Sequence, residues 1–474
     1  MSYIDVTDLT FSYVQGGQQI LQDQQLRFDQ GTFNVLTGPS GSGKSTFLRL
    51  LCGLFPQFTG HLLAGKILLD GQDVGQMSVT QRARKIALLF QVPSEQFAMP
   101  TPREELVFTL ENLRTDPAEI PTRLERVLAF TGTTQFADRK FTTLSGGEQQ
   151  RAALSVILAL DADIILLDEP FANVDPQTRA FLLKRLAALV SEQGKTVIIS
   201  DHDLTDYQFV ADYLYVLDPA KKQIHLADPA ERAQRFKAFD QQKHQAVAVD
   251  LPQKDGPVEF ALHDFATGYQ QNLLSQKQFQ LFQGHLTVFT GPNGVGKSTL
   301  FNAIAKLQGY RGSLTWHEQE IAKLKAKHYN RKVALVFQNP VSQFMQVTVK
   351  EELELSLKNR LANGWTKDQV QAALVDLDLA GRQEQVVYQL SEGQKRKLQI
   401  LLMLLLGVPT LLLDEPLTGL DLVSANKIMG YLQRAVKTEG KTVIMISHQL
   451  TNLAQYADYH IKLDHKELSY EATL

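Results

Sequence analysis

Short apolar runs alternate with helical patterns along this chain of 474 residues. Residues 35–37 and 164–167 have the composition of buried strands, and residues 46–54 repeat apolar side chains with a helical period. This alternation predicts a largely parallel α/β sheet covered by helices. The longest apolar stretch, residues 400–413, is interrupted by Gly407, Pro409 and Thr410. It therefore indicates a buried helix end followed by a buried strand, since a membrane span needs about 18 uninterrupted apolar residues.

Five blocks of sequence occur twice in the same order. TGPSGSGKST returns as TGPNGVGKST, ALLFQVPSEQF as ALVFQNPVSQF, LSGGEQQR as LSEGQKRK, LLDEP as LLDEP, and TVIISDH as TVIMISH. The distances between the later blocks are also equal in the two copies. A repeat of this length indicates a tandem duplication of one fold. We expect one domain over residues 1–227, a linker over 228–257 with a helix near 229–239, and a second domain over 258–474.

The first block has the pattern of a phosphate-binding loop, because G-x-x-x-x-G-K-S follows a strand and opens a helix. Its glycines let backbone N–H groups turn toward the phosphates of a nucleotide, and the helix N-terminus adds positive potential. The lysine neutralises phosphate oxygens, and the serine after it offers a hydroxyl to Mg²⁺. The expected ATP ligands are Gly38, Pro39, Ser40, Gly41, Ser42, Gly43, Lys44, Ser45 and Thr46, with Gly291, Pro292, Asn293, Gly294, Val295, Gly296, Lys297, Ser298 and Thr299 in the second copy.

In both copies an apolar run ends in Asp-Glu, at Asp168–Glu169 and Asp414–Glu415. Two carboxylates at the end of a buried strand are costly unless they have a function. We expect the aspartates to hold Mg²⁺ beside Ser45 and Ser298, and the glutamates to polarise the attacking water.

Three further pairs of side chains recur around these carboxylates. His202 and His448 each follow a strand, 34 residues after the aspartate, and are expected to contact the γ-phosphate and the water. Gln91 and Gln338 are expected to touch Mg²⁺ or that water from a loop that moves. Tyr13 and Tyr269 precede the phosphate loops and can stack on adenine. The alternative for the tyrosines is packing within a strand.

Composition limits the class of protein. Hydrophobic residues make up 44% and charged residues 21%, which is typical of globular domains and excludes a disordered or fibrous chain. The net charge of −3 gives no reason to expect nucleic-acid binding. A single cysteine, Cys52, suits a reducing cytoplasm, and the first residues do not resemble a signal peptide.

The block LSGGEQQR, 23 residues before Asp168, resembles the signature of ABC-type nucleotide-binding domains. The resemblance covers nearly the whole chain outside the linker and implies two tandem P-loop NTPase domains of the α/β class. Each would have a mainly parallel sheet, an antiparallel β subdomain and a helical subdomain. In that family two domains pair head to tail, and each ATP lies between the phosphate loop of one and the signature of the other. The implied signature residues are Ser145, Gly146, Gly147 and Glu148, with Ser391, Glu392, Gly393 and Gln394 in the second copy.

One signature departs from the family pattern, because Glu392 stands where the family usually has glycine. A glutamate adds negative charge and removes conformational freedom next to the phosphates. Head-to-tail pairing would put this signature in the site that uses Lys44. We therefore expect the two sites to hydrolyse ATP unequally, the site that uses Lys297 being the stronger.

The segments FQVPSEQF and FQNPVSQF, each followed by Thr and Glu-Glu, resemble the ATPases of energy-coupling factor (ECF) importers. That resemblance implies a transmembrane coupling subunit, a second membrane subunit that captures a vitamin, a precursor, cobalt or nickel, and a place on the cytoplasmic face of the membrane. Those partners would supply the membrane span. The alternative is a soluble twin-ABC ATPase that acts on ribosomes, although such proteins typically carry a much longer charged linker.

Overall fold

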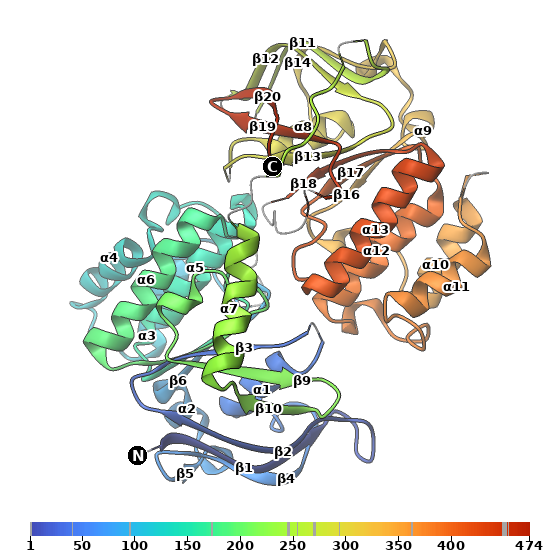
Figure 1. The fold of residues 1–474 in the computed structure, drawn as a ribbon. Helices are drawn as coiled ribbons and strands as arrows, with labels where there is room; N and C mark the ends of the chain where they lie inside the picture. Colours follow the sequence, from blue (N-terminus) through green and yellow to red (C-terminus); the bar gives the residue numbers. More distant parts are fainter. Residues whose placement is uncertain are drawn as a thin grey trace. The chain divides into compact units, whose positions relative to one another are not determined.

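The computed structural model describes residues 2–39, 41–93, 96–171, 174–243, 247–253, 255–268, 272–292, 294–361, 364–447, 453 and 455–474. The chain divides into two compact units, Met1–Gln241 and Gln242–Leu474 (Figure 1). Each unit contains a four-stranded antiparallel sheet and a six-stranded, mainly parallel sheet. The repetition in the sequence is therefore a repetition of the fold.

In the first unit the antiparallel sheet has the order β2-β1-β4-β5, and the larger sheet has the order β10-β9-β3-β8-β7-β6. The strands are β1 (Ser2–Ser12), β2 (Gln19–Asp29), β3 (Phe33–Thr37), β4 (His61–Leu69), β5 (Gln72–Asp73), β6 (Ile86–Leu89), β7 (Ile164–Asp168), β8 (Thr196–Ser200), β9 (Tyr213–Asp218) and β10 (Gln223–Leu226). The helices are α1 (Lys44–Leu51), α2 (Val79–Lys85), α3 (Pro102–Asn112), α4 (Ile120–Thr131), α5 (Gly146–Ala159), α6 (Pro176–Gln193) and α7 (Pro229–Lys243).

The second unit repeats this topology, with the orders β12-β11-β14-β15 and β16-β17-β18-β13-β19-β20. Its strands are β11 (Val258–Gly268), β12 (Asn272–Phe282), β13 (Leu286–Thr290), β14 (Arg311–Trp316), β15 (Gln319–Glu320), β16 (Val333–Val336), β17 (Thr410–Asp414), β18 (Thr442–Ile446), β19 (Tyr459–Asp464) and β20 (Glu467–Glu471). Its helices are α8 (Lys297–Ile304), α9 (Ala326–Tyr329), α10 (Val349–Asn359), α11 (Lys367–Asp376), α12 (Glu392–Leu406) and α13 (Leu422–Glu439).

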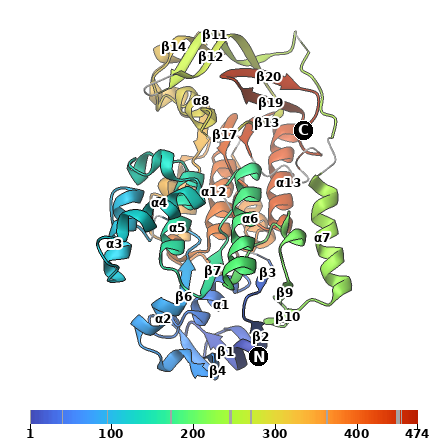
Figure 2. The same ribbon diagram turned by 90° about the vertical axis from the view of Figure 1, so that its left-hand side faces the viewer.

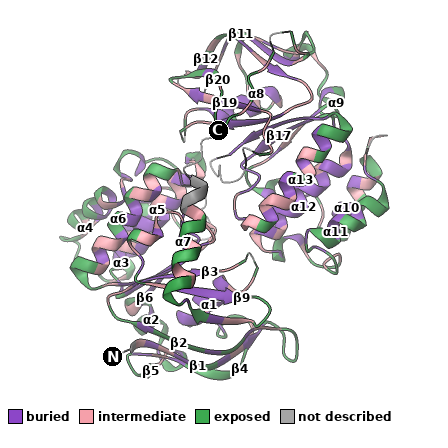
Figure 3. Cartoon of the chain, in the orientation of Figure 1, coloured by how far each residue is buried: buried purple, intermediate pink, exposed green. Residues whose placement is uncertain are grey.

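The predicted apolar strands are the middle of each large sheet. All residues of β3, β7 and β8 are buried, as are those of β17 and β18 (Figure 3). Strands covered on both faces need apolar side chains on both, which explains the continuous apolar runs. The stretch 400–413 is the end of α12 followed by β17, as predicted. The helix expected over 46–54 was too long: α1 ends at Leu51, because Gly53 turns into the left-handed region with φ 71°.

Three helices of each unit pack beside the sheets. In the first unit α3, α4 and α5 lie together (Figure 2) and share a separate apolar core. Leu106 and Leu110 of α3 meet Leu124 and Leu128 of α4 in this core. In the second unit α10, α11 and α12 carry the corresponding residues. Because α5 and α12 begin at the signature blocks, this helical layer positions the signatures.

The expected linker has its own structure. The helix expected over 229–239 is α7, which continues to Lys243. Residues 247–249 then pair with the end of the chain, since Val247 and Leu474 exchange backbone hydrogen bonds of 3.2 and 3.0 Å. The limits of the two domains at 227 and 258 remain a prediction. Among the described residues no helix is both long and apolar enough to cross a membrane.

Candidate nucleotide-binding and hydrolysis site

Each phosphate loop joins a central strand to a helix: β3 leads to α1, and β13 leads to α8. Lys44 opens α1 and is 4% exposed, and its Nζ donates to the carbonyls of Gly38 (2.8 Å) and Pro39 (3.0 Å). Lys297 opens α8 and makes the same two bonds, the first to Gly291, both at 2.8 Å. Each ammonium group is thus held over its own loop, at the N-terminus of a helix with no acidic residue in its first turn. This is a site for an anion.

The glycine before each lysine is required by geometry. Gly43 has φ 117°, and a Cβ atom there would lie 3.0 Å from Ile20 Cγ2. Gly296 has φ 110°, and a Cβ atom there would lie 2.8 Å from Leu273 Cβ. Only glycine adopts this backbone without strain at such close contact. The loop motif is therefore also a packing requirement of the fold.

The aspartates predicted to hold metal end β7 and β17. Burial raises the pKa of Asp168 and of Asp414, while the hydroxyls of Ser45 and Ser298 hydrogen-bond the two carboxyls. Ser200 Oγ also donates to Asp168, at 2.5 Å. A carboxylate beside a hydroxyl is a donor set that fits Mg²⁺, which needs few protein oxygens because phosphates and water complete its shell. Accordingly, no cluster of three or more metal-binding side chains occurs among the described residues.

Glu169 and Glu415, expected to polarise water, follow these aspartates in an unusual backbone conformation. Both have positive φ, 46° and 51°. Their N–H groups donate to neighbouring strand ends, Glu169 to the carbonyl of Ser200 (3.0 Å) and Glu415 to that of Ile446 (3.1 Å). Positive φ in a residue other than glycine is costly and is concentrated at functional sites. The two units share this geometry.

In the first unit Glu169 gathers the other predicted side chains. Gln91 Nε2 donates to Glu169 Oε2 at 2.8 Å, and His202 Nδ1 lies 3.9 Å from Glu169 Oε1. Burial alone would raise the pKa of Glu169, but His202, Lys44 and Gln91 outweigh it and lower the pKa to about 2. Burial alone would lower the pKa of His202, but Glu169 together with Asp201 raises it to about 8. Among the described residues nothing hydrogen-bonds the buried His202 Nε2, so a protonated imidazole can donate from this atom to a phosphate.

The second unit differs around the corresponding glutamate. The side chain of Gln338 is exposed, whereas Gln91 is partly buried against Glu169. In the described part of this unit two cations act on Asp414: Lys297 of the phosphate loop and Arg396, a buried residue of α12 that also interacts electrostatically with Glu415. Sequence reasoning missed Arg396. The signal was that it stands in a repeated block where the first copy has Gln150.

The two signatures begin their helices in the same way. Ser145 caps α5 in a capping box with Glu148, whose Oε2 accepts from the Ser145 N–H at 2.8 Å. Ser391 caps α12 in the same box with Gln394, whose Oε1 accepts from the Ser391 N–H at 3.0 Å. Glutamate and glutamine therefore do the same structural work at this position.

Glu392, the residue that departs from the family signature, is the first residue of α12. Its Oε1 lies 2.7 Å from Nζ of Lys395, one turn along the helix. Glu392 thus has a cationic partner, which the sequence pattern did not reveal. The first unit has Gly146 and Gln149 at these positions and has no such pair there.

Tyr13 lies beside the first phosphate loop. Its hydroxyl is 2.7 Å from Thr46 Oγ1, and its ring meets Phe11 and Phe55 edge to face, at 5.3 and 5.8 Å between ring centres. The side chain is still 41% exposed, and its stacking on adenine remains a prediction. Four predicted residues lie outside the described residues: Ser40, Tyr269, Asn293 and His448.

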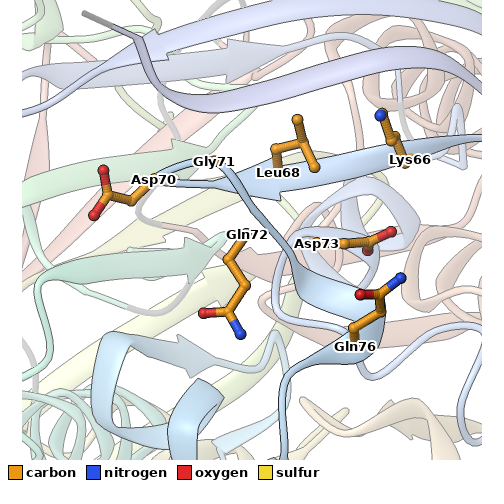
Figure 4. A pocket seen from close by; sticks show the side chains of 7 residues that line it. All are labelled: Lys66, Leu68, Asp70, Gly71, Gln72, Asp73 and Gln76. Atoms are coloured by element: carbon orange, nitrogen blue, oxygen red, sulfur yellow. The ribbon is translucent and has the colours of Figure 1, made fainter.

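A hollow of about 620 Å³ lies away from these motifs in the sequence, on the antiparallel sheet of the first unit (Figure 4). Its walls come from β4, β5 and the turns beside them. The lining residues are Lys66, Leu68, Asp70, Gly71, Gln72, Asp73 and Gln76. None of them belongs to a nucleotide-binding motif, and we assign the hollow no part in ATP hydrolysis.

Comparison with known families and proteins agrees with this geometry. The sequence model of the family described as "ABC transporter" matches residues 21–172 and 274–418. The "Putative HMP/thiamine import ATP-binding protein YkoD" of Bacillus subtilis (strain 168) is 31% identical, over 99% of this chain and 91% of its own length. A "Putative ABC transporter ATP-binding protein" of Methanosarcina mazei is 27% identical, over 97% of this chain and 87% of its own length. The predicted pair of ABC ATPase domains is thereby confirmed.

Two solved structures share the fold over 98% of the chain. One is described as "RNase-L Inhibitor", with a TM-score of 0.61, 18% identity and 90% of its own chain covered. The other is the complex of the archaeal ribosomal stalk protein aP1 with the archaeal ribosome recycling factor aABCE1, with a TM-score of 0.62, 19% identity and 89% of that chain covered. At this identity the likeness concerns the twin-ABC fold alone.

Proposed function

The chain belongs to the ABC transporter family, and from this premise we propose that it is the ATPase subunit that energises an ECF-type membrane importer. The observation that carries the proposal is the B. subtilis relative, which matches over nearly the full length of both proteins and whose name includes import. The cargo of that relative, HMP or thiamine, is of the vitamin and precursor class. ATP hydrolysis itself follows from the family and from the two sets of site residues.

In the proposed cycle the two domains of one chain pair head to tail on two ATP molecules. Site one uses Lys44, Asp168, Glu169 and His202 with the signature Ser391–Gln394, and site two uses Lys297, Asp414, Glu415 and His448 with the signature Ser145–Glu148. Each lysine leaves its loop carbonyls for the phosphates, and each glutamate orients the attacking water. Mg²⁺, when bound, would neutralise charge on the phosphates beside Asp168 and Asp414. Closure and reopening then move the partner subunits.

The membrane partner would bind the segment that follows the glutamine of each domain. In the second unit this segment exposes Met345 (78%) and Val347 (59%), and Tyr388 (53%) follows Val387, which donates its N–H to the Val347 carbonyl. The buried Glu352 fixes the segment, accepting backbone N–H bonds from Met345 and Gln346. Apolar side chains held outward on a rigid loop favour a protein partner. We place the chain on the cytoplasmic face of the membrane, without nucleic acid.

We propose further that the two sites are unequal. Glu392 in the signature of site one adds a carboxylate near the phosphates, although Lys395 offsets its charge. Site two has glycines in its signature and both carboxylates. The test compares Glu169→Gln with Glu415→Gln in steady-state ATP hydrolysis. Glu415→Gln should lose the larger share of the ATPase activity. Equal losses in the two variants would show that the two sites are not unequal.

The rival is a ribosome-associated twin-ABC ATPase. The two solved structures carry descriptions of that kind, but their likeness extends only to the fold. A tagged chain purified from detergent-solubilised membranes distinguishes the two functions. If the chain belongs to an importer, a polytopic membrane protein should copurify with it in stoichiometric amount. The Glu415→Gln variant, which should bind ATP without hydrolysing it at site two, serves as the control. Cosedimentation with ribosomes and no membrane partner would replace the importer with the rival.

A further inference from the structure

The signature helix of the second unit is bonded to the loop that carries Gln338, here named the second glutamine loop (residues 337–339). Arg396 of α12 is 5% exposed, and its guanidinium donates to the carbonyls of Phe337 (3.2 Å) and Gln338 (2.5 Å). Both acceptors belong to the main chain. The arginine therefore holds the path of the loop, whatever the side chain of Gln338 does.

A second residue of α12 supports the same loop. Gln399 is fully buried, and its Nε2 donates to the Phe337 carbonyl (3.0 Å) and to Gln343 Oε1 (2.8 Å). Its Oε1 accepts from Arg396 at 3.1 Å. Gln343 in turn accepts from the Phe337 N–H at 3.2 Å. The helix and the loop are thus joined by a continuous buried hydrogen-bond network.

The described part of the first unit keeps the loop half of this network, since Gln96 accepts from the Phe90 N–H at 2.9 Å, but lacks the bonds that Arg396 and Gln399 make from the signature helix. Gln150 and Ala153 stand at the positions of Arg396 and Gln399 in α5. Gln150 is 2% exposed, and among the described residues neither atom of its amide has a hydrogen-bond partner. The first glutamine loop (residues 90–92) is bonded to Gln96 through the Phe90 N–H and to Glu169 through the side chain of Gln91.

The charge of Arg396 also reaches the hydrolytic carboxylates. Burial lowers the pKa of Arg396 to about 10, so the guanidinium remains charged at neutral pH. Glu392, Glu415 and Asp414 face it and favour that charge. A buried cation is costly without such partners.

We infer that Arg396 is a positioning residue for hydrolysis in the second domain, holding the second glutamine loop by its main chain. The first domain, with Gln150, positions its loop by the contact between Gln91 and Glu169 instead. The two ATPase domains therefore differ in how the signature helix is coupled to the glutamine loop. This inference rests on the proposed role of the two glutamines in hydrolysis.

The test replaces Arg396 by the residue of the first copy, in a full chain that carries Glu169→Gln so that hydrolysis depends on Glu415. Arg396→Gln should lower kcat about tenfold, as expected for loss of hydrogen bonds from a charged donor, while KM for ATP changes less than twofold. The rate of amide hydrogen exchange at residues 337–339 should rise about tenfold or more. Arg396→Lys should restore part of both. Lys397→Gln is the matched control, since Lys397 is buried on the same helix but pairs with Asp378 (3.7 Å).

Two further variants keep the test decisive if Arg396→Gln unfolds. Gln399→Ala copies Ala153 and should raise exchange of the same loop with a smaller loss of kcat. Gln150→Arg, in a chain with intact Glu169, should slow exchange of residues 90–92. Unchanged exchange and kcat in Arg396→Gln, or equal effects of Lys397→Gln, would overturn the inference. If Glu169→Gln alone abolishes all hydrolysis, the proposed division between sites fails, and loop exchange still tests Arg396.

Discussion

The contact between His202 and Glu169 predicts a pKa of His202 that can be measured by titration. Burial lowers the pKa of His202, but Glu169 and, to a smaller extent, Asp201 outweigh it and raise the pKa from 6.5 to about 8. A net shift of this size corresponds to about 2 kcal/mol, and the attraction of His202 to the carboxylates exceeds this figure because burial opposes it. Replacing Glu169 by Gln removes the negative charge and leaves the burial. The pKa of His202 should therefore fall in Glu169→Gln, although Asp201, 3.9 Å from His202 Nδ1, still raises it.

The sign of the pH dependence follows from the same shift. Because the pKa is higher in the folded chain, the pair stabilises the fold fully below pH 6.5, and this contribution is lost as pH rises through about 8. Glu169 itself, with a pKa lowered to about 2, loses its contribution only in acid. Hydrolysis that depends on protonated His202 should decline over the same alkaline range.

The assay is an NMR titration of the chain with ¹³C-labelled histidine, in which His202→Gln identifies the signal among the 11 histidines. Wild type should show His202 titrating near pH 8, and Glu169→Gln should show it titrating at a lower pH. Gln91→Ala is the control, since it removes a neutral partner of Glu169 and should move the titration much less. A His202 that titrates at 6.5 or lower in wild type, or one indifferent to Glu169→Gln, would refute the reasoning.

Three other predictions concern single contacts. Gly43→Ala should introduce about 1–3 kcal/mol of strain, because φ is 117° and the new Cβ would approach Ile20 Cγ2; ATP affinity measured by equilibrium dialysis should fall, and unchanged affinity would contradict this. Glu105→Ala should remove the acceptor of the Ala98 and Met99 N–H groups, at a cost of about 1 kcal/mol for each bond, and so weaken binding of the membrane partner in pull-down while ATP binding persists. Lys395→Gln should reduce the positive charge that offsets Glu392 and weaken ATP binding at site one, whereas a double variant that also carries Glu392→Gly should recover it.

Much of the site could be predicted from local sequence. A phosphate loop consists of a strand, a turn and a helix that are adjacent in the sequence. The motif around Gly43 and Lys44 therefore predicts both the local fold and a nucleotide ligand. Asp168 and Asp414 could likewise be predicted as site residues, because each ends an apolar run that forms a buried strand. Local signals were weaker at boundaries: the helix predicted to residue 54 ends at Leu51, because Gly53 packs against Arg82 in a left-handed turn.

The sequence by itself determined that this chain is a duplicated ABC ATPase, since the order and spacing of its motifs are set by short-range geometry that each copy repeats. Only the tertiary structure decided which residues of those motifs contact one another. Gln91 meets Glu169 across 78 residues, whereas Arg396 reaches the main chain of Gln338 across 58. Burial and charge at such contacts depend on which side chains the fold brings together, and two copies with the same motif order can therefore differ in electrostatics.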